Sequence, residues 1–463
     1  MDTSKLKRFA QDARRMLLEQ VETKLKTVLS EDSLARRESK EAVKSLEDVI
    51  KKTSSNRVVE RVAYFWFNRL CAFRYMDVNR FTKVLVVSPQ EGYTQPEILA
   101  EAKAGHVHGD LLPLVNKGRL MGLLSGSVQS NEPQQEAYRM LLVASCNQYH
   151  KLMPFLFEKI EDYSELLLPD DLLSENSIVA LTREALSTEN CVDIEVIGWL
   201  YQFYISEKKD AVFADLKKNR KITPENIPAA TQLFTPHWIV RYMVENSLGR
   251  LWLLNHPDSR LIDKMEYYIK PEQEETDFLK INSPEEIKVC DPACGSGHIL
   301  VYAFDLLYSI YEEQGYDTKE IPALILKNNL FGIELDERAG ELAAFALVMK
   351  AREKYRRFLY NPVQPNICVL EKVEFDEEDL ESYMQRVGRD LFTVNLEETL
   401  KQFKDADNFG SLIRPSETDV TGVLKLLESK GVEGNLFLAS THENVLKILR
   451  MVEYLSPRYH VVV

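Results

Sequence analysis

A strand-like run that leads through a glycine turn into a helix constrains the fold of this chain more than any other feature. Residues 287–298 read IKVCDPACGSGH, and apolar side chains recur at helical spacing in the segment that follows. Glycines at positions 295 and 297 let the backbone approach a ligand closely, and the start of the helix offers free N–H groups. The segment therefore predicts a ligand-binding turn between a strand and a helix.

The residues of this turn differ from those of a dinucleotide site. Such a site prefers the pattern GxGxxG, and Leu300 stands where the third glycine would be. Asp291 lies at the tip of the strand, and its carboxylate suits a cationic ligand group better than a pyrophosphate, because like charges repel. A plain connection between strand and helix is the alternative for a lone GxG, but the full DPACGSG pattern favours a binding site.

The second half of the chain alternates strand-like and helical runs. This alternation predicts an α/β fold with a parallel sheet and crossover helices. The expected strands are 287–290, 330–335, 366–370 and 459–463, and the expected helices are 298–313, 338–352 and 443–453. A polar stretch at 254–286 interrupts this region, and we expect the acidic run 374–381 to be a surface loop.

The second expected strand also ends in acidic residues. Parallel strands place their carboxyl ends at one edge of the sheet, where ligands bind. Glu334 would lie at that edge, and an ionised carboxylate can accept hydrogen bonds from both hydroxyls of a ribose. A solvated acid is the alternative, but the nearby DPACGSG turn favours a nucleoside ligand. Asp336 is predicted to cap the helix that follows.

The first two hundred or so residues have a different pattern. Apolar residues recur there at helical spacing, as in the series Leu6, Phe9, Ala13, Leu17 and Val21. Further along, Thr235 and Pro236 form a typical helix start, as N-cap and first helical residue, and Gly249 is expected to end that helix. We therefore expect a mostly helical domain before the α/β region.

Charge and composition exclude several classes of protein. The chain has 58 basic and 72 acidic residues, a formal net charge of −14, so it is a poor general binder of DNA. Six cysteines occur without a CxxC pair or a histidine cluster, and we expect no metal site. The N-terminus is charged where a signal peptide is apolar, and apolar runs are too short to span a bilayer. These features predict a cytoplasmic protein that does not enter the membrane.

Three motifs together resemble a known family. TQLFTP (231–236), DPACGSG (291–297) and GIELDERAGELA (332–343) are similar, in that order, to the binding motifs for S-adenosylmethionine (SAM) in N6-adenine DNA methyltransferases. The similarity is greater to the PglX methyltransferases of BREX phage-defence systems, and it extends over essentially the whole chain. It implies a Rossmann-like, SAM-dependent methyltransferase sheet, incomplete at its C-terminus and preceded by a mostly helical domain.

The resemblance also implies a cofactor, SAM, and a role for each motif residue. The TQLFTP residues would line the methionine end of the cofactor, the DPACGSG residues would hold its amino-acid and ribose portions, Glu334 would bind the ribose hydroxyls, and Leu335 would pack on the adenine. The full set of cofactor residues is Phe234, Thr235, Pro236, Asp291, Ala293, Gly295, Ser296, Gly297, Glu334 and Leu335.

The family pattern continues with an (N/D/S)PP(Y/F) loop after the fourth strand, which residues 1–463 do not contain. The resemblance therefore implies the N-terminal portion of a site-specific adenine-N6 DNA methyltransferase, with no catalytic residue identified here and no activity alone. Double-stranded DNA would bind mainly through segments outside this chain. Other BREX proteins or a complementing C-terminal polypeptide are possible partners. The alternatives are a non-catalytic subunit that docks other defence proteins and a protein-glutamine methyltransferase.

These expectations divide the chain into four parts. They are a helical domain at 1–215, a connector with the TQLFTP helix at 216–250, a polar insertion at 251–286, and a partial SAM-binding domain at 287–463.

Overall fold

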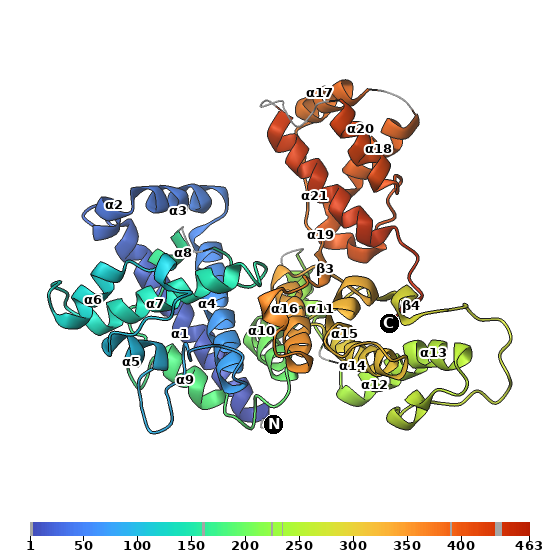
Figure 1. Ribbon diagram of the computed structural model, residues 1–463. Helices are drawn as coiled ribbons and strands as arrows, with labels where there is room; N and C mark the ends of the chain where they lie inside the picture. The colour runs from blue at the N-terminus through green and yellow to red at the C-terminus, as the bar shows by residue number, and fades with distance from the viewer. Residues whose placement is uncertain (1–2, 160–162, 224–225, 234, 389–390, 431–437) are drawn as a thin grey trace. The chain divides into compact units, whose positions relative to one another are not determined.

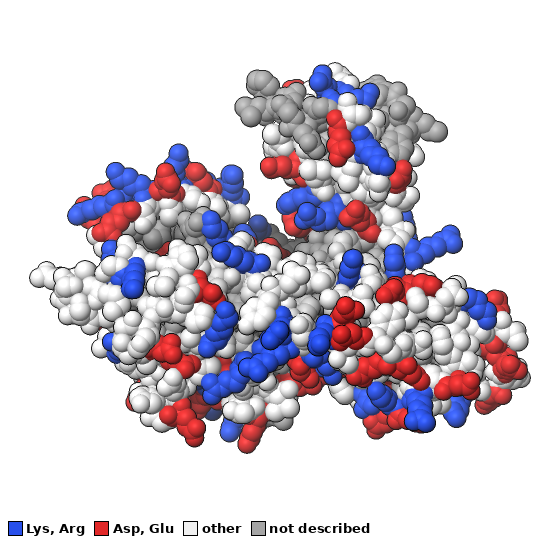
Figure 2. All heavy atoms as spheres, viewed as in Figure 1, with Lys and Arg blue, Asp and Glu red and all other residues white. Residues whose placement is uncertain are grey.

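The computed structural model describes residues 3–159, 163–223, 226–233, 235–388, 391–430 and 438–463. The chain forms two compact units, Met1–Asp210 and Ala211–Val463 (Figure 1). On the face in Figure 2, acidic and basic side chains of the described residues are interspersed. The net negative charge is therefore not gathered in a single patch on that face.

The first unit is built from helices. Its elements are α1 (Thr3–Leu29), α2 (Leu34–Glu38), α3 (Lys40–Lys52), α4 (Ser55–Val78), α5 (Glu97–Lys103), η1 (Leu112–Leu114), α6 (Lys117–Ser125), α7 (Pro133–His150), α8 (Tyr163–Leu166), α9 (Ile178–Ala185) and the start of α10 (Glu195–Leu216). The apolar series predicted from Leu6 to Val21 is buried along α1, which confirms that helix. Helix α4 is buried on most sides and packs against α1.

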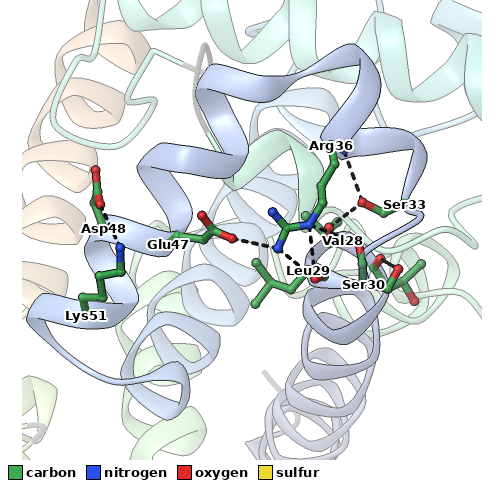
Figure 3. A network of polar contacts seen from close by, with 9 residues as sticks. Val28, Leu29, Ser30, Ser33, Arg36, Glu47, Asp48 and Lys51 are labelled. Atoms are coloured by element: carbon green, nitrogen blue, oxygen red, sulfur yellow. Dashed lines mark hydrogen bonds and ion pairs between the residues drawn. The ribbon is translucent and has the colours of Figure 1, made fainter.

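Arg36 joins the end of α1 to α2 and α3 (Figure 3). Its guanidinium donates hydrogen bonds to the carbonyls of Leu29, at 2.9 Å, and Ser30, at 3.1 Å, and it pairs with Glu47 Oε1 at 2.7 Å. The last carbonyls of a helix have no partner within the helix, so a basic side chain there is stabilising. Ser33 caps α2 by accepting the backbone N–H of Arg36 at 3.2 Å.

A buried carboxylate organises the segment after α4. The two carboxylate oxygens of Asp77 accept three backbone N–H groups, from Val86, Val87 and Ser88 at 2.9 to 3.0 Å, and the hydroxyl of Thr82 at 2.9 Å. Burial raises the pKa of Asp77 to about 6, although these four hydrogen bonds act in the opposite direction. The donors all belong to residues 82–88, so Asp77 fixes the path of the chain there.

The second unit contains a four-stranded parallel sheet in the order β3-β2-β1-β4. The strands are β1 (Val289–Asp291), β2 (Leu330–Glu334), β3 (Asn366–Val369) and β4 (Val461–Val462). Helices α14 (His298–Glu313) and α16 (Glu337–Lys354) connect the first three strands. The prediction of an α/β fold with a parallel sheet is confirmed, and the carboxyl ends of all four strands share one edge.

The remaining elements of this unit are helical. Before β1 lie α11 (Ile227–Thr231), α12 (His237–Val244), the π-helix η3 (Glu245–Gly249), α13 (Arg250–Asn255), η4 (Arg260–Lys264) and η5 (Pro284–Glu286). Between β1 and β3 lie α15 (Ile321–Leu324), η6 (Ile325–Asn329) and η7 (Phe358–Tyr360). Between β3 and β4 lie α17 (Glu377–Val387), α18 (Leu391–Gln402), η8 (Phe403–Asp405), α19 (Ala406–Phe409), η9 (Gly410–Leu412), α20 (Val420–Ser429) and α21 (Ala439–Leu455). All of these elements except η9 contribute residues to one apolar core.

The polar stretch before β1 is attached to α12–α13 by side-chain amides. Asn246 donates to the carbonyl of Tyr267 and accepts the N–H of Ile269, both at 2.8 Å. In the same way, Asn255 donates to the carbonyl of Leu279 at 2.9 Å and accepts the N–H of Ile281 at 3.0 Å. Each amide therefore pairs with extended backbone much as a neighbouring strand would.

Two sequence predictions about the helix after Pro236 are wrong. Helix α12 begins at His237 with Pro236 as its N-cap residue and no side-chain cap bond, so Thr235 does not cap it. Gly249 does not end the helix, which passes through η3 into α13. A Cβ at Gly249 would collide with Met265 Sδ, so the glycine serves close packing.

The acidic run predicted as a surface loop at 374–381 is helical from Glu377. Asp376 caps α17 by accepting backbone N–H groups at 3.0 and 3.4 Å, and acids in a first turn are favourable there. Leu380, Tyr383, Met384 and Val387 form its buried face.

No helix in the described part of the chain is both long enough and apolar enough to cross a membrane. Among the same residues, no group of three or more His, Cys, Asp or Glu side chains is arranged to hold a metal ion.

Candidate functional site

Asp291 is the last residue of β1, at the carboxyl edge of the sheet. Its side chain is buried, and its Oδ1 accepts the backbone N–H of Ala293 at 3.1 Å. The final strand runs alongside β1, and the N–H of Val463 donates to the carbonyl of Cys290 at 3.0 Å. Asp291 therefore ends a central strand, which has β2 on one side and β4 on the other.

The glycine turn connects β1 to α14 in a conformation that requires glycine. Gly295 and Gly297 have φ values of +53° and +82°, a region that other residues rarely adopt. A Cβ at Gly297 would lie 3.0 Å from Cα and Cβ of Ala343, so this glycine also permits close packing between α14 and α16. At Gly295, by contrast, no described atom outside the glycine and its two chain neighbours lies within 4 Å of a Cβ position. The backbone at 295 is therefore open to a ligand.

Glu334 ends β2 beside this turn. Its Oε2 accepts the N–H of Gly295 at 2.6 Å, and its Oε1 accepts the N–H groups of Leu335 at 2.9 Å and Asp336 at 3.0 Å. The carbonyl of Ile333 accepts the N–H of Cys294 at 2.9 Å. These bonds fasten the turn after β1 to the end of β2, so the two acidic strand ends form one site.

Electrostatics set this site apart. The pKa of Asp291 is raised to about 7, mainly by burial and also by the negative charge of Glu334, against the lowering effect of the Ala293 hydrogen bond. Burial also raises the pKa of Glu334, although its three backbone donors oppose the shift. Two carboxyls at neighbouring strand ends repel each other, and a cation placed against both would favour their ionised forms.

Leu335 and Asp336 follow β2 with different surroundings. Asp336 caps α16, as predicted, by accepting the N–H of Arg338 at 3.1 Å, and it binds the guanidinium of the same residue at 2.8 and 3.0 Å. Leu335 is half-buried and packs against Gly410, which comes from the helical segment between β3 and β4. Leu335 thus lies at the same carboxyl edge of the sheet as Glu334, but it contacts the segment between β3 and β4, whereas Glu334 contacts the glycine turn.

The start of α12 lies next to the start of α14. The ring centroids of His237 and His298 are 6.0 Å apart, and His298 directly follows Gly297. Thr235 and Pro236 immediately precede His237 in the sequence, at the start of α12. Phe234, from the same predicted set, lies outside the described residues.

The sequence interpretation missed a buried acid beside this pair of helices. Glu245 is fully buried in η3, and it accepts the hydroxyl of Tyr302 at 2.6 Å and the backbone N–H of Tyr267. Arg241 Nε lies 3.4 Å from Glu245 Oε1, and the Tyr302 ring contacts His237 with centroids 6.2 Å apart. The sequence does carry a signal for this acid, because Glu245 lies among the apolar residues 240, 244 and 248, which recur at helical spacing.

The predicted residues of β1, the glycine turn and the end of β2 therefore meet at one edge of the sheet. Asp291, the 293–297 turn and Glu334 are linked by hydrogen bonds, and His237, which follows Thr235 and Pro236 in the sequence, contacts His298. Chemically, the arrangement offers two carboxylates, an open stretch of glycine backbone and a neighbouring apolar residue. Such a site suits a ligand that carries both positive charge and hydroxyl groups.

Comparison with known proteins places this site within a methyltransferase segment. Residues 272–361 match the family model described as MmeI, DNA-methyltransferase domain. The matched range includes β1, the glycine turn, β2 and α16.

Similar proteins cover most of the chain. The adenine-specific methyltransferase BrxX of Escherichia coli O9:H4 (strain HS) is 42% identical over 441 residues, which is 88% of this chain and 35% of BrxX. The adenine-specific methyltransferase PglX of Lacticaseibacillus casei (strain Zhang) is 32% identical over 462 residues, which is 89% of this chain and 38% of PglX. A putative type II restriction enzyme and methyltransferase of Methanocaldococcus jannaschii is 26% identical over 133 residues, which is 25% of this chain and 11% of that protein.

The chain thus spans little more than a third of the length of BrxX and PglX. Over that region, it is homologous to the BrxX and PglX adenine-specific methyltransferases of BREX systems.

Proposed function

We propose that the α/β unit is a Rossmann-like domain that binds SAM, and that the chain is the N-terminal portion of a BREX-type adenine-specific DNA methyltransferase. The observation that carries the proposal is the link between two acidic strand ends, in which Gly295 of the turn after Asp291 donates to Glu334 at 2.6 Å. The strand order β3-β2-β1-β4 matches the first four strands of a classic doubly wound sheet, whose ligands bind outside the carboxyl ends.

The residues present fit SAM. The cofactor carries a sulfonium and an ammonium group, and the repulsion between Asp291 and Glu334 is offset by a cationic ligand. The open backbone at Gly295 gives room for close approach. The carboxylate of Glu334 already accepts three backbone N–H groups, and an ionised carboxylate has about four acceptor positions. A ribose hydroxyl would therefore take the remaining position or displace one of these donors.

In this proposal, each motif residue keeps the role implied by the family resemblance. Asp291, Ala293, Gly295, Ser296 and Gly297 hold the amino-acid and ribose portions, Glu334 binds ribose, and Leu335 packs on adenine. Thr235 and Pro236, with Phe234, line the methionine end. The division into a helical domain (1–215), a connector (216–250), an insertion (251–286) and a partial cofactor domain (287–463) belongs to the same proposal.

When bound, SAM supplies an activated methyl group. The residues of this chain bind and orient the cofactor at the edge of the sheet. The exocyclic amine of adenine is a poor nucleophile, so transfer also requires groups that position a flipped base and stabilise the charge that develops on nitrogen. In the family pattern these groups belong to the (N/D/S)PP(Y/F) loop, which residues 1–463 lack. We propose that the chain alone binds SAM without methylating DNA, and that DNA, other BREX proteins or a complementing polypeptide bind in the longer assembly.

Calorimetry with SAM, followed by methyl transfer to unmethylated genomic DNA, tests the proposal. We expect binding by the chain, loss of binding in Asp291→Asn, and methylation only when a polypeptide that carries the loop is added. Asp258→Asn is the matched control, because it removes an equal charge at an exposed position of the same unit. Methylation by the chain alone would contradict the requirement for the loop, and absence of SAM binding would contradict the cofactor assignment.

A further inference from the structure

A turn from the helical segment between β3 and β4 reaches the proposed cofactor edge. It comprises Phe409, Gly410, Ser411 and Leu412, and is called the 409–412 turn below. Gly410 is buried and has a φ of +55°. A Cβ at this position would lie 3.2 Å from Leu335 Cδ2. A side chain at 410 would thus force the turn away from the end of β2, so glycine permits this close approach.

The turn is held in place from both sides. The N–H of Ile413 donates to the carbonyl of Gly410 at 3.1 Å, and the Arg414 guanidinium donates to the carbonyl of Ser411 at 3.0 Å. On the other side, the N–H of Val373, just beyond β3, donates to the carbonyl of Phe403 at 3.1 Å. The turn therefore lies against the carboxyl end of β2, and the helical residues just before it are bonded to the segment that follows β3.

Two large apolar side chains of this turn face solvent. Phe409 is 53% exposed and Leu412 is 75% exposed, although Ile413 next to them is buried. Exposed apolar side chains beside a proposed ligand site fit a binding role, because ligand pockets are lined mainly by apolar and aromatic groups. A ligand that places its ribose on Glu334 would direct its base toward Leu335 and this turn.

We propose that the 409–412 turn forms the wall of the cofactor site on the adenine side. Phe409 and Leu412 supply the apolar surface that covers the base, and Gly410 sets the spacing between that wall and Leu335. The inference rests on the proposed function, because it takes SAM as the ligand of Asp291 and Glu334. It adds residues from a segment that none of the three motifs includes.

Base size provides the test. We expect Phe409→Ala and Leu412→Ala each to weaken SAM binding by about five- to thirtyfold, because an apolar cover of the ring is removed. A SAM analogue that carries a benzyl group on adenine N6 probes the wall directly. The wild-type chain should bind the analogue only weakly, because the wall leaves little room for the benzyl group. Each variant opens space in the wall and should bind the analogue at least as tightly as the wild-type chain does. The preference for SAM over the analogue should therefore fall by at least about fivefold.

Tyr360→Ala is the matched control, because Tyr360 is 72% exposed and lies between the end of α16 and the start of β3, on the amino side of the sheet. It should bind both ligands as wild type does. Unchanged binding of both ligands in both turn variants would overturn the inference and assign the surface to a macromolecular partner. Equal loss for both ligands would also overturn it, because disturbed folding does not change base-size preference. Failure of the wild-type chain to bind SAM would overturn the proposed function first and this inference with it.

Discussion

Two buried aspartates, one in each unit, have opposite surroundings. Asp77 lies in the last turn of α4 and accepts four hydrogen bonds, three of them from backbone N–H groups of residues 86–88. Asp291 lies at the end of β1, accepts the N–H of Ala293, and has the acidic Glu334 as its charged neighbour. Burial raises the pKa of both, to about 6 for Asp77 and about 7 for Asp291.

The difference separates a structural acid from one that fits a ligand site. A buried carboxylate costs free energy unless donors compensate it. The chain itself supplies those donors around Asp77, so the residue orders its own loop. Around Asp291 the nearby acid increases the cost of ionisation, and a cationic ligand would reduce it. The pKa alone does not distinguish the two sites, whereas the identity of the neighbours does.

Replacement of each aspartate by asparagine should give the largest difference between the two sites. Asp291→Asn should weaken SAM binding by about a hundredfold or more, because loss of one partner of a buried charge pair costs about 2 to 5 kcal/mol. Asp77→Asn should leave SAM affinity unchanged but destabilise the first unit by about 1 to 3 kcal/mol, because an amide nitrogen cannot accept the N–H groups of residues 86–88. Calorimetry measures the first effect and urea denaturation the second.

Amide hydrogen exchange provides the control for this pair. In Asp77→Asn, the amides of Val86, Val87 and Ser88 should exchange faster, whereas in Asp291→Asn they should keep their protection. A loss of SAM affinity in Asp77→Asn equal to that in Asp291→Asn would break the comparison.

The pH dependence of binding should differ in the same way. The folded pKa of Asp291, about 7, lies above the usual value of about 3.9. The stability that this shift contributes is fully present below about pH 3.9 and is lost as the pH rises through about 7. SAM should favour the ionised carboxylate, so its affinity should increase by about tenfold per unit up to about pH 7 and then level off.

Calorimetry in buffers of different ionisation enthalpy should detect proton release on SAM binding below about pH 7. Asp77→Asn should leave this profile unchanged, although it should remove the loss of folding stability through about pH 6. A flat SAM affinity from pH 5.5 to 8.5 would show that Asp291 does not face the cationic groups of the ligand.

The contrast between these acids also shows what the sequence could predict. Strand-to-helix transitions near β1 and β2 depend on local apolar spacing, so Asp291, Glu334 and the helices after them were placed correctly. Asp77 was not singled out, because its partners are mainly backbone N–H groups, which every residue type provides. The sequence gives no signal for such a site.

Tertiary contacts explain the failed predictions. Gly249 resembles a helix end, but its lack of a side chain accommodates Met265, a contact that only the folded chain reveals. The acidic run at 374–381 was interpreted from charge alone, whereas the buried face of α17 begins with Leu380. Likewise, the bond between Gly295 and Glu334 joins residues far apart in sequence, so the sequence predicted both residues but not their contact.

Removal of one donor from Asp77 should have a smaller effect. Thr82→Val keeps the shape of the side chain but deletes the hydroxyl that lies 2.9 Å from Asp77 Oδ1. We expect a loss of about 1 kcal/mol in the free energy of unfolding at pH 8. The loss should be smaller at pH 5, because the hydrogen bond lowers the pKa of Asp77 and so stabilises its ionised form. Urea denaturation at the two pH values measures this, and a larger loss at pH 5 would contradict the assignment.

The smallest expected effect isolates the repulsion between the two acids of the site. Glu334→Gln removes a negative charge that raises the pKa of Asp291, so the midpoint of the pH profile for SAM binding should move to lower pH by less than about one unit. The plateau affinity should also fall, because the amide nitrogen cannot accept the N–H of Gly295. The midpoint is therefore the informative quantity, since loss of a ribose acceptor alone would leave it unchanged. Glu337→Gln, an exposed acid in the first turn of α16, is the control and should keep the wild-type midpoint. A midpoint that moves to higher pH in Glu334→Gln would mean that Glu334 stabilises the ionised form of Asp291, contrary to the repulsion described here.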